Sequence, residues 1–354
     1  MSDREFKKLL ARYDYKLPPD CIASTPASLR DSAKLMVYNR RDGSITDAVF
    51  RDLPKFLPKG ALLVFNETKV VPARLALTKS TGGAVRILFI DLKGKRFRVL
   101  ADRAINANDV LFFNDKPAFR VCDREGSYHV LTPVCRMNLK NFLERYGDAP
   151  LPPYIKNSPL TKTERRRCYQ TVFAKTPGSI AAPTASLHFT TGLLRKLKKS
   201  GIETVLITLH VGLGTFAPLK PENFEKQSLH EEEFSISAAA ARAINKALRD
   251  GRPIIAVGTT TLRALESVAH STRLRRVDAH GNMKKLSGKT SLFIREGYNF
   301  RIADGIITNF HVQRSSILML VSAFAGREHI LKLYRRAIKK DYRFFSFGDG
   351  MLIL

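Results

Sequence analysis

The chain has 354 residues, of which 44% are apolar and 26% charged, and its formal net charge is +28. The length suits two domains, and the apolar content is sufficient for globular ones. So large a basic excess predicts a polyanionic partner, and nucleic acid is favoured over a membrane, because the longest apolar run (316–326) is about half of what spans a bilayer.

Two further features indicate an intracellular protein. Residues 1–15 carry charges where a signal peptide needs an apolar core. Four scattered cysteines without a CxxC pair argue against zinc ribbons and iron–sulfur clusters, and we expect ordinary, mostly buried thiols in a reducing compartment, the cytoplasm. These are Cys21, Cys122, Cys135 and Cys168.

The first part of the chain is rich in strand signals. Residues 34–50 predict a hairpin with Asp42 and Gly43 in its turn, and a strand is expected at 61–65. From 74 to 135 short strands alternate with turn residues, as in a small barrel or sandwich, and a helix is expected at 138–147.

A proline cluster at 149–156 predicts a rigid connection, and an α/β pattern follows it. We expect helices at 190–201, 235–251, 260–269 and 316–340, strands at 203–211, 252–258 and 305–312, and an exposed loop at 270–291. The predicted fold class is α/β: a discontinuous α/β domain (1–70 and 150–354) with an inserted small β-barrel domain (71–149).

Candidate site residues lie where the α/β strands end, since ligands bind beyond the carboxyl ends of such strands. The candidates are His210, Gly212 and Gly214 after one strand, Thr259, Thr260 and Arg263 at a helix start, and Asn309 and His311 after another strand. Helix starts attract anions, although plain capping by threonine explains the same residues equally well.

Two more segments supply histidines. "SLHEEEFSI" (228–236) places His230 beside Glu232, either as a tuned general base or in a solvated acidic turn, and the turn is favoured for the segment alone. "GSIAAPTASLHFT" (178–190) has small residues, Thr184 and one histidine, His188. The four strand-end histidines suggest one polar cleft, and no zinc-ligand spacing is present.

The order of motifs resembles one family, the S-adenosylmethionine:tRNA ribosyltransferase-isomerases of queuosine biosynthesis. The blocks that carry the resemblance are "LLVFNETKVVPARL" (62–75), "PLPPYI" (150–155), "YQTVFAKTPGSIAAPTASLHFT" (169–190), "LHVGLGTFAPL" (209–219), "VGTTTLRALES" (257–267), "DGIITNFHV" (304–312) and "YRFFSFGDGMLIL" (342–354). Together they run nearly the full length of the chain.

The resemblance implies a reaction in which the ribosyl part of S-adenosylmethionine is transferred and isomerised onto 7-aminomethyl-7-deazaguanine at the wobble position of tRNA. The product would be epoxyqueuosine, with adenine and methionine released. S-adenosylmethionine is then a consumed substrate, so that no cofactor is expected, and we expect a monomer. The runner-up activity is a methyltransferase, and a different class is a non-catalytic RNA-binding protein.

This chemistry needs a base, an acid and a neutral amine, and neutral histidines suit such tasks. We therefore expect His188 to face a ligand on the bare segment, the alternative being a packed loop whose histidine bonds only to backbone. The candidate catalytic residues are His188 and His210 first, then His230 with Glu232, then His311.

Arginines suit anionic groups, so Arg74 and Arg263 are the candidates for a substrate carboxylate or a tRNA phosphate. Basic residues at 69–98 make the barrel a plausible anticodon-arm platform, with a solvated face as the alternative. The chain departs from the family pattern at Arg86, Phe97, Ser186 and Gln313. Ser186 lies closest to the site, where a change from glycine would narrow the pocket or disturb a positive φ angle.

Overall fold

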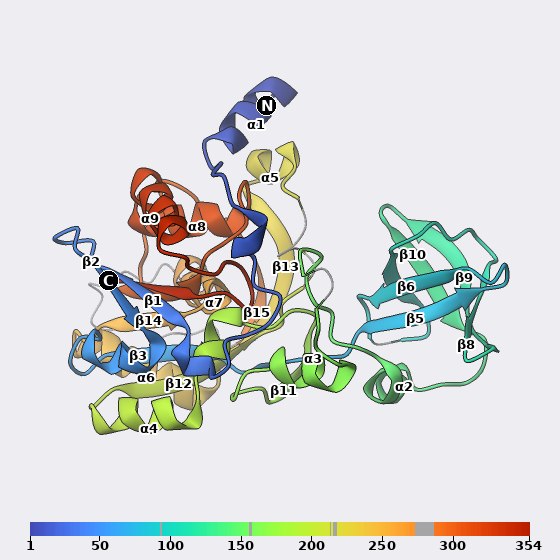
Figure 1. Cartoon of the computed structure of the whole chain (residues 1–354), viewed down its shortest axis with the longest axis horizontal. Coiled ribbons are helices and arrows are strands. Elements are labelled where there is room, and N and C mark those ends of the chain that lie inside the picture. The colour runs from blue at the N-terminus through green and yellow to red at the C-terminus, as the bar shows by residue number, and fades with distance from the viewer. Residues whose placement is uncertain (93, 156–157, 213, 215–217, 273–286) are drawn as a thin grey trace. The chain divides into compact units, whose positions relative to one another are not determined.

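The computed structural model describes residues 1–92, 94–155, 158–212, 214, 218–272 and 287–354. Figure 1 shows the course of the chain. It splits into two compact units. The first comprises Met1–Lys69, Pro152–Pro159 and Gln170–Leu354, and the second Val70–Leu151 and Leu160–Tyr169. Segment 160–169, which the sequence placed with the α/β part, therefore groups with the inserted unit.

Within the described residues, nine strands form the sheet of the first unit. Their order is β15 (Ser287–Leu292), β13 (Ser228–Ser235), β12 (Glu203–Leu209), β3 (Leu62–Asn66), β14 (Ile254–Val257), β16 (Gly305–Asn309), β17 (Gly350–Ile353), β1 (Lys34–Tyr38) and β2 (Ile45–Val49). The central strands β12, β3, β14 and β16 are parallel. Their carboxyl ends therefore meet at one edge of the sheet, where α/β folds bind ligands.

The sheet is buried on both faces because its central strands are continuously apolar. In β3, Leu62 and Val64 belong to one hydrophobic core, and Leu63 and Phe65 to a second. The first core includes residues of α1 (Asp3–Ala11), α5 (Pro221–Glu225), α6 (Ala238–Arg249), α7 (Thr259–Thr272), α8 (Ser316–Ala325) and α9 (Arg327–Lys339). The second includes residues of α4 (Thr191–Lys199) and the 3-10 helices η3 (Phe50–Lys55) and η4 (Thr184–His188).

The remaining elements of this unit are short. They are the 3-10 helices η1 (Pro19–Cys21) and η2 (Arg30–Ser32), and a two-stranded sheet of β4 (Thr68–Val70) and β11 (Thr176–Ser179). The predicted hairpin is present as the antiparallel pair β1 and β2, with Gly43 at a φ of 72° in its turn.

The second unit is a closed barrel. Its strand order is β10 (Tyr128–Pro133), β7 (Phe97–Ala101), β6 (Ala84–Phe89), β5 (Arg74–Lys79), β8 (Val110–Phe113) and β9 (Lys116–Glu125). The strands alternate between buried and exposed positions, as a small filled barrel requires. The predicted fold class, an α/β domain with an inserted small β-barrel, is thereby confirmed.

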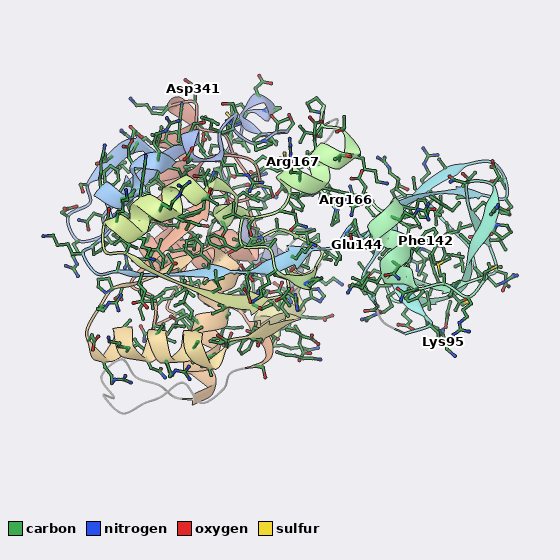
Figure 2. All side chains as sticks on the ribbon, turned by 90° about the horizontal axis from the view of Figure 1, so that it is seen from below. Lys95, Phe142, Glu144, Arg166, Arg167 and Asp341 are labelled. Carbon is green, nitrogen blue, oxygen red and sulfur yellow. The ribbon has the colours of Figure 1, made fainter. Side chains whose placement is uncertain are left out.

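Two helices accompany the barrel strands in this unit, α2 (Leu139–Tyr146) and α3 (Lys162–Cys168). Arg166 of α3 contacts Glu144 of α2 at 2.9 Å, and both are labelled in Figure 2. Arg165 of α3 pairs with Asp148. These ion pairs explain why a segment that follows the proline cluster still belongs with the barrel.

Three sequence predictions need correction. The helix expected at 316–340 is two helices, because Gly326 adopts a φ of 86°, which an α-helix does not accommodate. The expected loop at 270–291 includes the end of α7 and strand β15, while its residues 273–286 lie outside the described part. The cysteines are not mostly buried: Cys122 and Cys135 are exposed, and Cys21 and Cys168 are partly exposed.

Within the described residues, no helix combines the length and the apolar character that crossing a bilayer requires.

Candidate active site

A cavity lies at the carboxyl ends of β14 and β16, and we call it the first cavity. Its walls include Thr259, Thr260, Asn309 and His311, which follow or end these strands. The small residues of 181–185 form another part of the wall. The bare segment "GSIAAPTASLHFT" therefore borders open space, as small side chains permit.

Asn309 and Thr184 meet on this wall. The Thr184 hydroxyl donates to Asn309 Oδ1 at 2.8 Å, and Asn309 Nδ2 donates to the carbonyl oxygen of Asp349 at 3.4 Å. Asn309 is 2% exposed, so its amide has little freedom to rotate. Both residues were predicted to bind substrate, and the structure brings them together.

His188 occupies a different place from the one expected. It is 5% exposed, its ring stacks on Phe50 with centroids 4.1 Å apart, and it is not among the residues that line the first cavity. Its Nε2 lies 3.2 Å from Asn309 Nδ2 and accepts a hydrogen bond from this amide. His188 thus contacts the cavity wall from inside the protein, neither facing a ligand nor bonding to backbone alone.

The protonation state of His188 follows from its burial. Desolvation, followed by the positive charge of Arg343, lowers the pKa of His188 to about 3. The imidazole is therefore neutral at physiological pH, as acceptance of the Asn309 hydrogen bond requires.

His311 lies on the wall of the first cavity and remains partly exposed. Its Nε2 is 2.6 Å from Thr308 Oγ1, and its backbone N–H donates to the Tyr334 hydroxyl at 2.8 Å. The Tyr15 hydroxyl donates to its carbonyl oxygen. Desolvation lowers the pKa of His311 to about 3, so this histidine too is neutral at physiological pH.

His210 lies apart from the first cavity. It follows β12 and lines a separate depression with Thr208, Glu233 and Lys289. Its Nδ1 is 2.9 Å from Thr68 Oγ1, whose other partner, Ser179 Oγ, is at 2.6 Å. The single polar cleft expected for four histidines is therefore not formed.

The close approach of His210 to the chain depends on a glycine. A Cβ on Gly178 would lie 2.6 Å from His210 Nδ1, far inside van der Waals contact. Gly178 therefore allows the imidazole to pack on backbone.

A second, smaller chamber is lined by His230, Glu232 and Arg263, and we call it the Arg263 chamber. The segment 228–235 is strand β13 and not an acidic turn, so that alternate glutamates point to opposite faces. Glu231 and Glu233 are exposed, whereas Glu232 is 3% exposed.

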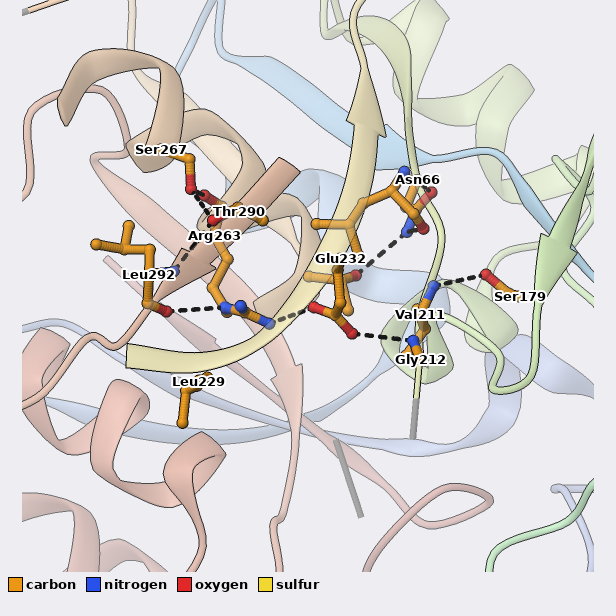
Figure 3. A network of polar contacts seen from close by, with 12 residues as sticks. Asn66, Ser179, Val211, Gly212, Leu229, Glu232, Arg263, Ser267, Thr290 and Leu292 are labelled. Atoms are coloured by element: carbon orange, nitrogen blue, oxygen red, sulfur yellow. Dashed lines mark hydrogen bonds and ion pairs between the residues drawn. The ribbon is translucent and has the colours of Figure 1, made fainter. Parts of the chain in front are cut away.

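Two donors among the described residues hold the buried carboxylate of Glu232. Gly212 N–H donates to Oε1 at 3.1 Å, and Arg263 Nη1 donates to Oε2 (Figure 3). Arg263 Nε in turn donates to the carbonyl oxygen of Leu292 at 3.2 Å. Glu232 is therefore a partner of Arg263, whereas the sequence led us to expect it beside His230, as the carboxylate that tunes a general base.

Gly214 and His230 are packed together at the edge of this chamber. A Cβ on Gly214 would lie 2.6 Å from His230 Cβ, so the position accepts only glycine without rearrangement. Gly212, by contrast, contributes its backbone N–H, which any residue but proline supplies. The two predicted glycines thus act differently.

The first cavity and the Arg263 chamber adjoin each other. Thr259, Thr260 and Ile317 line both of them. The start of α7 therefore faces both spaces, and its first N–H groups have no acceptor within the helix. Of the predicted residues, Thr184, His230, Glu232, Thr259, Thr260, Arg263, Asn309 and His311 line these two spaces, with Gly214.

Arg74 belongs to the barrel unit. Its Nη2 donates to the carbonyl oxygen of Leu151 at 2.9 Å, and burial lowers the pKa of its guanidinium. Other basic barrel residues pair with aspartates of the same unit: Arg86 with Asp102, Arg96 with Asp123 and Arg98 with Asp91. These pairs offset part of the positive charge of the barrel unit.

Asn66, the last residue of β3, was not predicted as a site residue from the sequence. It is buried, its Nδ2 donates to the carbonyl oxygen of Leu209 at 2.9 Å, and its Oδ1 accepts from Leu209 N at 3.0 Å. Nδ2 also lies 3.4 Å from Thr260 Oγ1. Asn66 thus ties the ends of β3 and β12 to the start of α7. Its position at a strand end was the available signal.

Ser186 is fully buried in η4, and no partner of its Oγ is present among the described residues. It is absent from the non-glycine residues with positive φ and does not line the first cavity. The expected narrowing of the pocket and disturbance of a positive φ angle are therefore not seen. In the described part of the chain, no three His, Cys, Asp or Glu residues are grouped as metal ligands.

Comparison with known proteins gives one consistent result. Residues 10–353 match the family model described as queuosine biosynthesis protein. A relative from Carboxydothermus hydrogenoformans, named S-adenosylmethionine:tRNA ribosyltransferase-isomerase, is 46% identical and covers 98% of this chain and 99% of its own. A relative of the same name from Halothermothrix orenii is 43% identical over 97% and 98% of the two chains.

A solved structure is also similar. The crystal structure of S-adenosylmethionine tRNA ribosyltransferase from Thermotoga maritima superposes with a TM-score of 0.55 at 31% identity, covering 97% of this chain and 100% of that one.

Proposed function

Because the chain belongs to the queuosine biosynthesis protein family, we propose that it transfers and isomerises the ribose of S-adenosylmethionine onto 7-aminomethyl-7-deazaguanine at the wobble position of tRNA. The products are epoxyqueuosine-tRNA, adenine and methionine. Membership fixes the enzyme class, an S-adenosylmethionine:tRNA ribosyltransferase-isomerase. The observation that carries the finer proposal is the pair of adjoining spaces at the start of α7, which are lined by hydrogen-bonded polar groups and by the ion pair of Glu232 and Arg263.

The proposed reaction balances without a redox partner. The aminomethyl nitrogen of the tRNA base forms a bond to carbon and loses one proton. The bond from ribose to the sulfonium sulfur breaks, which leaves methionine, and the bond from ribose to adenine breaks, with adenine taking a proton. The remaining carbon skeleton rearranges to the epoxide-bearing ring. The chain must therefore accept and return protons and exclude water.

Two histidines on the cavity walls are suited to this task. His311 is neutral and held by Thr308, so that it orients a substrate group by hydrogen bonding. His230 is the more exposed of the two and lies at the Arg263 chamber, where it is our candidate for proton transfer. His188 and Asn309 position Thr184, and Glu232 positions Arg263.

The tRNA partner agrees with the charge of the chain. The whole sequence carries +28, and the barrel unit alone has 18 basic and 9 acidic residues. Such an excess favours phosphate contacts that raise affinity without reading sequence. We further propose that the enzyme acts in the cytoplasm as a monomer and needs no resident cofactor, because S-adenosylmethionine is consumed.

Free adenine measures the proposed reaction. Purified protein is mixed with S-adenosylmethionine and tRNA that carries 7-aminomethyl-7-deazaguanine, and adenine is quantified by chromatography. We expect adenine release that depends on the aminomethyl base and is absent with tRNA that carries guanine there. Folded protein that releases S-adenosylhomocysteine, or no adenine, would contradict the proposal.

A further inference from the structure

The guanidinium of Arg263 has one N–H donor group without a hydrogen-bond partner among the described residues. Nη1 donates to Glu232 and Nε to the carbonyl oxygen of Leu292, but Nη2 is buried and has no hydrogen-bond partner among the described residues. Arg263 is 9% exposed and lines the Arg263 chamber. Figure 3 shows its bonds to Glu232 and Leu292. A buried, unsatisfied donor on a charged group is costly, so such a donor points to a ligand that satisfies it.

The start of α7 presents further donors to the same space. Thr259 and Thr260 line the chamber, and the hydrogen bond from Leu262 N to Gly258 O begins the helical pattern. The N–H groups that precede Leu262 have no acceptor within the helix, and the helix dipole adds partial positive charge there. Helix α7 has 14 residues, which is long enough for this effect. Hydrogen-bond donors from Arg263 and from the start of α7 therefore lie on the same chamber.

The remaining walls limit what this anion can be. Leu229, Ile294 and Leu320 are apolar and surround the polar groups. A polyanionic backbone would bury several charges against these side chains, whereas a carboxylate at the end of a short aliphatic tail would bury one. Glu232 adds a negative charge, but Arg263 and Gly212 already neutralise and bond it. The chamber is suited to a short, partly apolar tail that carries one carboxylate, and an α-ammonium group beside that carboxylate would share the chamber with Glu232.

We propose that the Arg263 chamber binds the methionyl tail of S-adenosylmethionine, with its α-carboxylate held by Arg263 Nη2 and the first N–H groups of α7. This assignment rests on the proposed function and adds the orientation of the substrate. The adenosyl part then occupies the first cavity, because Thr259, Thr260 and Ile317 border both spaces. The rings of Tyr154 and Phe345, 4.7 Å apart, lie on the wall of that cavity and offer an aromatic surface for adenine.

The test compares S-adenosylmethionine with its decarboxylated analogue, which lacks only the carboxylate. Affinities are measured by titration calorimetry in the presence of tRNA with guanine at the wobble position, so that no turnover occurs. We expect wild type to bind the analogue about 10- to 100-fold more weakly, as for the loss of a charge-assisted hydrogen bond. Arg263→Lys keeps a cation beside Glu232 but lacks the second guanidinium nitrogen. It should lose affinity for S-adenosylmethionine and very little for the analogue.

A matched control is available at Arg252. Its Nε donates to the carbonyl oxygen of Gly60 at 2.7 Å and its Nη1 to Glu203 at 2.8 Å, the same pattern as in Arg263, but Arg252 does not line either space. Arg252→Lys should bind both ligands as wild type does. Folding of each variant is checked by urea unfolding, and Arg263→Gln combined with Glu232→Gln serves if the lysine variant is unstable.

The outcomes separate the two proposals. Equal affinity of wild type for both ligands, or an Arg263→Lys loss that is the same for both, overturns the carboxylate assignment. If adenine is still released from S-adenosylmethionine in that case, the proposed function stands although the carboxylate assignment is wrong. If wild type binds neither ligand and releases no adenine, both proposals fall.

Discussion

The Nε2 of His188 and the Nδ2 of Asn309 lie 3.2 Å apart, and this hydrogen bond places a neutral, buried imidazole directly behind the wall of the first cavity. Asn309 in turn fixes the position of Thr184, whose hydroxyl donates a hydrogen bond to Asn309 Oδ1. The arrangement works only while His188 remains unprotonated, since an imidazolium has no lone pair to offer the amide. It therefore ties the geometry of the cavity to pH.

His188→Gln is predicted to reduce the acid sensitivity of folding. The pKa of His188 is about 3 in the folded chain, whereas an unperturbed histidine in the unfolded chain has a pKa of 6.5. At a pH between 3 and 6.5, the unfolded chain therefore binds one more proton than the folded chain does. The free energy of unfolding therefore falls as the pH falls below 6.5, by about 1.4 kcal/mol per pH unit for one such group. Urea unfolding from pH 7 to pH 4 measures this slope.

The variant should show a slope shallower by about one proton than wild type. His311 has a similarly lowered pKa and contributes equally to both proteins. Parallel curves for the two proteins would contradict a neutral His188 in the folded state.

Glu232→Gln is predicted to destabilise the chain by about 3 kcal/mol, because it leaves Arg263 as a buried cation without its counter-charge. Glu232 and Arg263 are 3% and 9% exposed. Equilibrium urea unfolding at pH 7 measures the loss. The neighbouring Glu231→Gln, on the exposed face of the same strand, is the control and should stay within about 0.5 kcal/mol of wild type. Similar values for both variants would refute the buried pair.

How far these features were predictable depends on the kind of signal they leave. Strand alternation and turn residues predicted the barrel, and apolar runs predicted the parallel strands, because burial acts on every residue of such elements. The helix break at Gly326 was not predicted, because its positive φ is a property of one residue inside a long helical pattern. Strand β13 was not predicted, because three consecutive glutamates resemble a surface turn. The middle glutamate, Glu232, is buried only because the fold pairs it with Arg263, 31 positions away.

The site was predicted in part for a similar reason. Residues that end strands can be recognised in the sequence, and Thr184, Thr259, Thr260, Asn309 and His311 do line the first cavity. The sequence does not show into which space the side chain of a strand-end residue points. His188 and His210 have the same kind of sequence neighbours as His311. In the structure, however, His188 stacks on Phe50 inside the protein, and His210 bonds to Thr68 at a separate depression.

Ser186→Ala is predicted to stabilise the fold slightly. The Oγ of Ser186 is buried without a partner among the described residues, so that its desolvation is uncompensated. Removing the oxygen should raise the free energy of unfolding by about 1 kcal/mol, with adenine release unchanged, since Ser186 does not line the first cavity. Thermal unfolding measures the difference. A loss of stability would indicate that this hydroxyl is bonded after all.

Gly178→Ala is predicted to displace His210. The added Cβ would lie 2.6 Å from the imidazole Nδ1, so either the ring or the backbone must move, at a cost of about 1–3 kcal/mol. The hydrogen bond between His210 and Thr68 would be lost with it. Urea unfolding gives the energy, and a crystal structure or the histidine NMR signals would show the movement.

Gly192→Ala is the matched control for this substitution. A Cβ added there would have Thr190 Oγ1 as its nearest neighbour, at 3.6 Å, and the residue lies in helix α4, where alanine is favoured over glycine. This variant should be as stable as wild type or slightly more so. If Gly178→Ala behaves in the same way, close packing of His210 on the backbone is disproved.

The most direct measurement follows the fate of the sugar. S-adenosylmethionine labelled in its ribose carbons, and a second sample labelled in its methyl group, are each incubated with the protein and with tRNA that carries 7-aminomethyl-7-deazaguanine. We predict that the ribose label enters the tRNA in a one-to-one ratio with released adenine, while the methyl label leaves as methionine. Transfer of the methyl label to tRNA, with the ribose label retained in S-adenosylhomocysteine, would contradict ribosyl transfer.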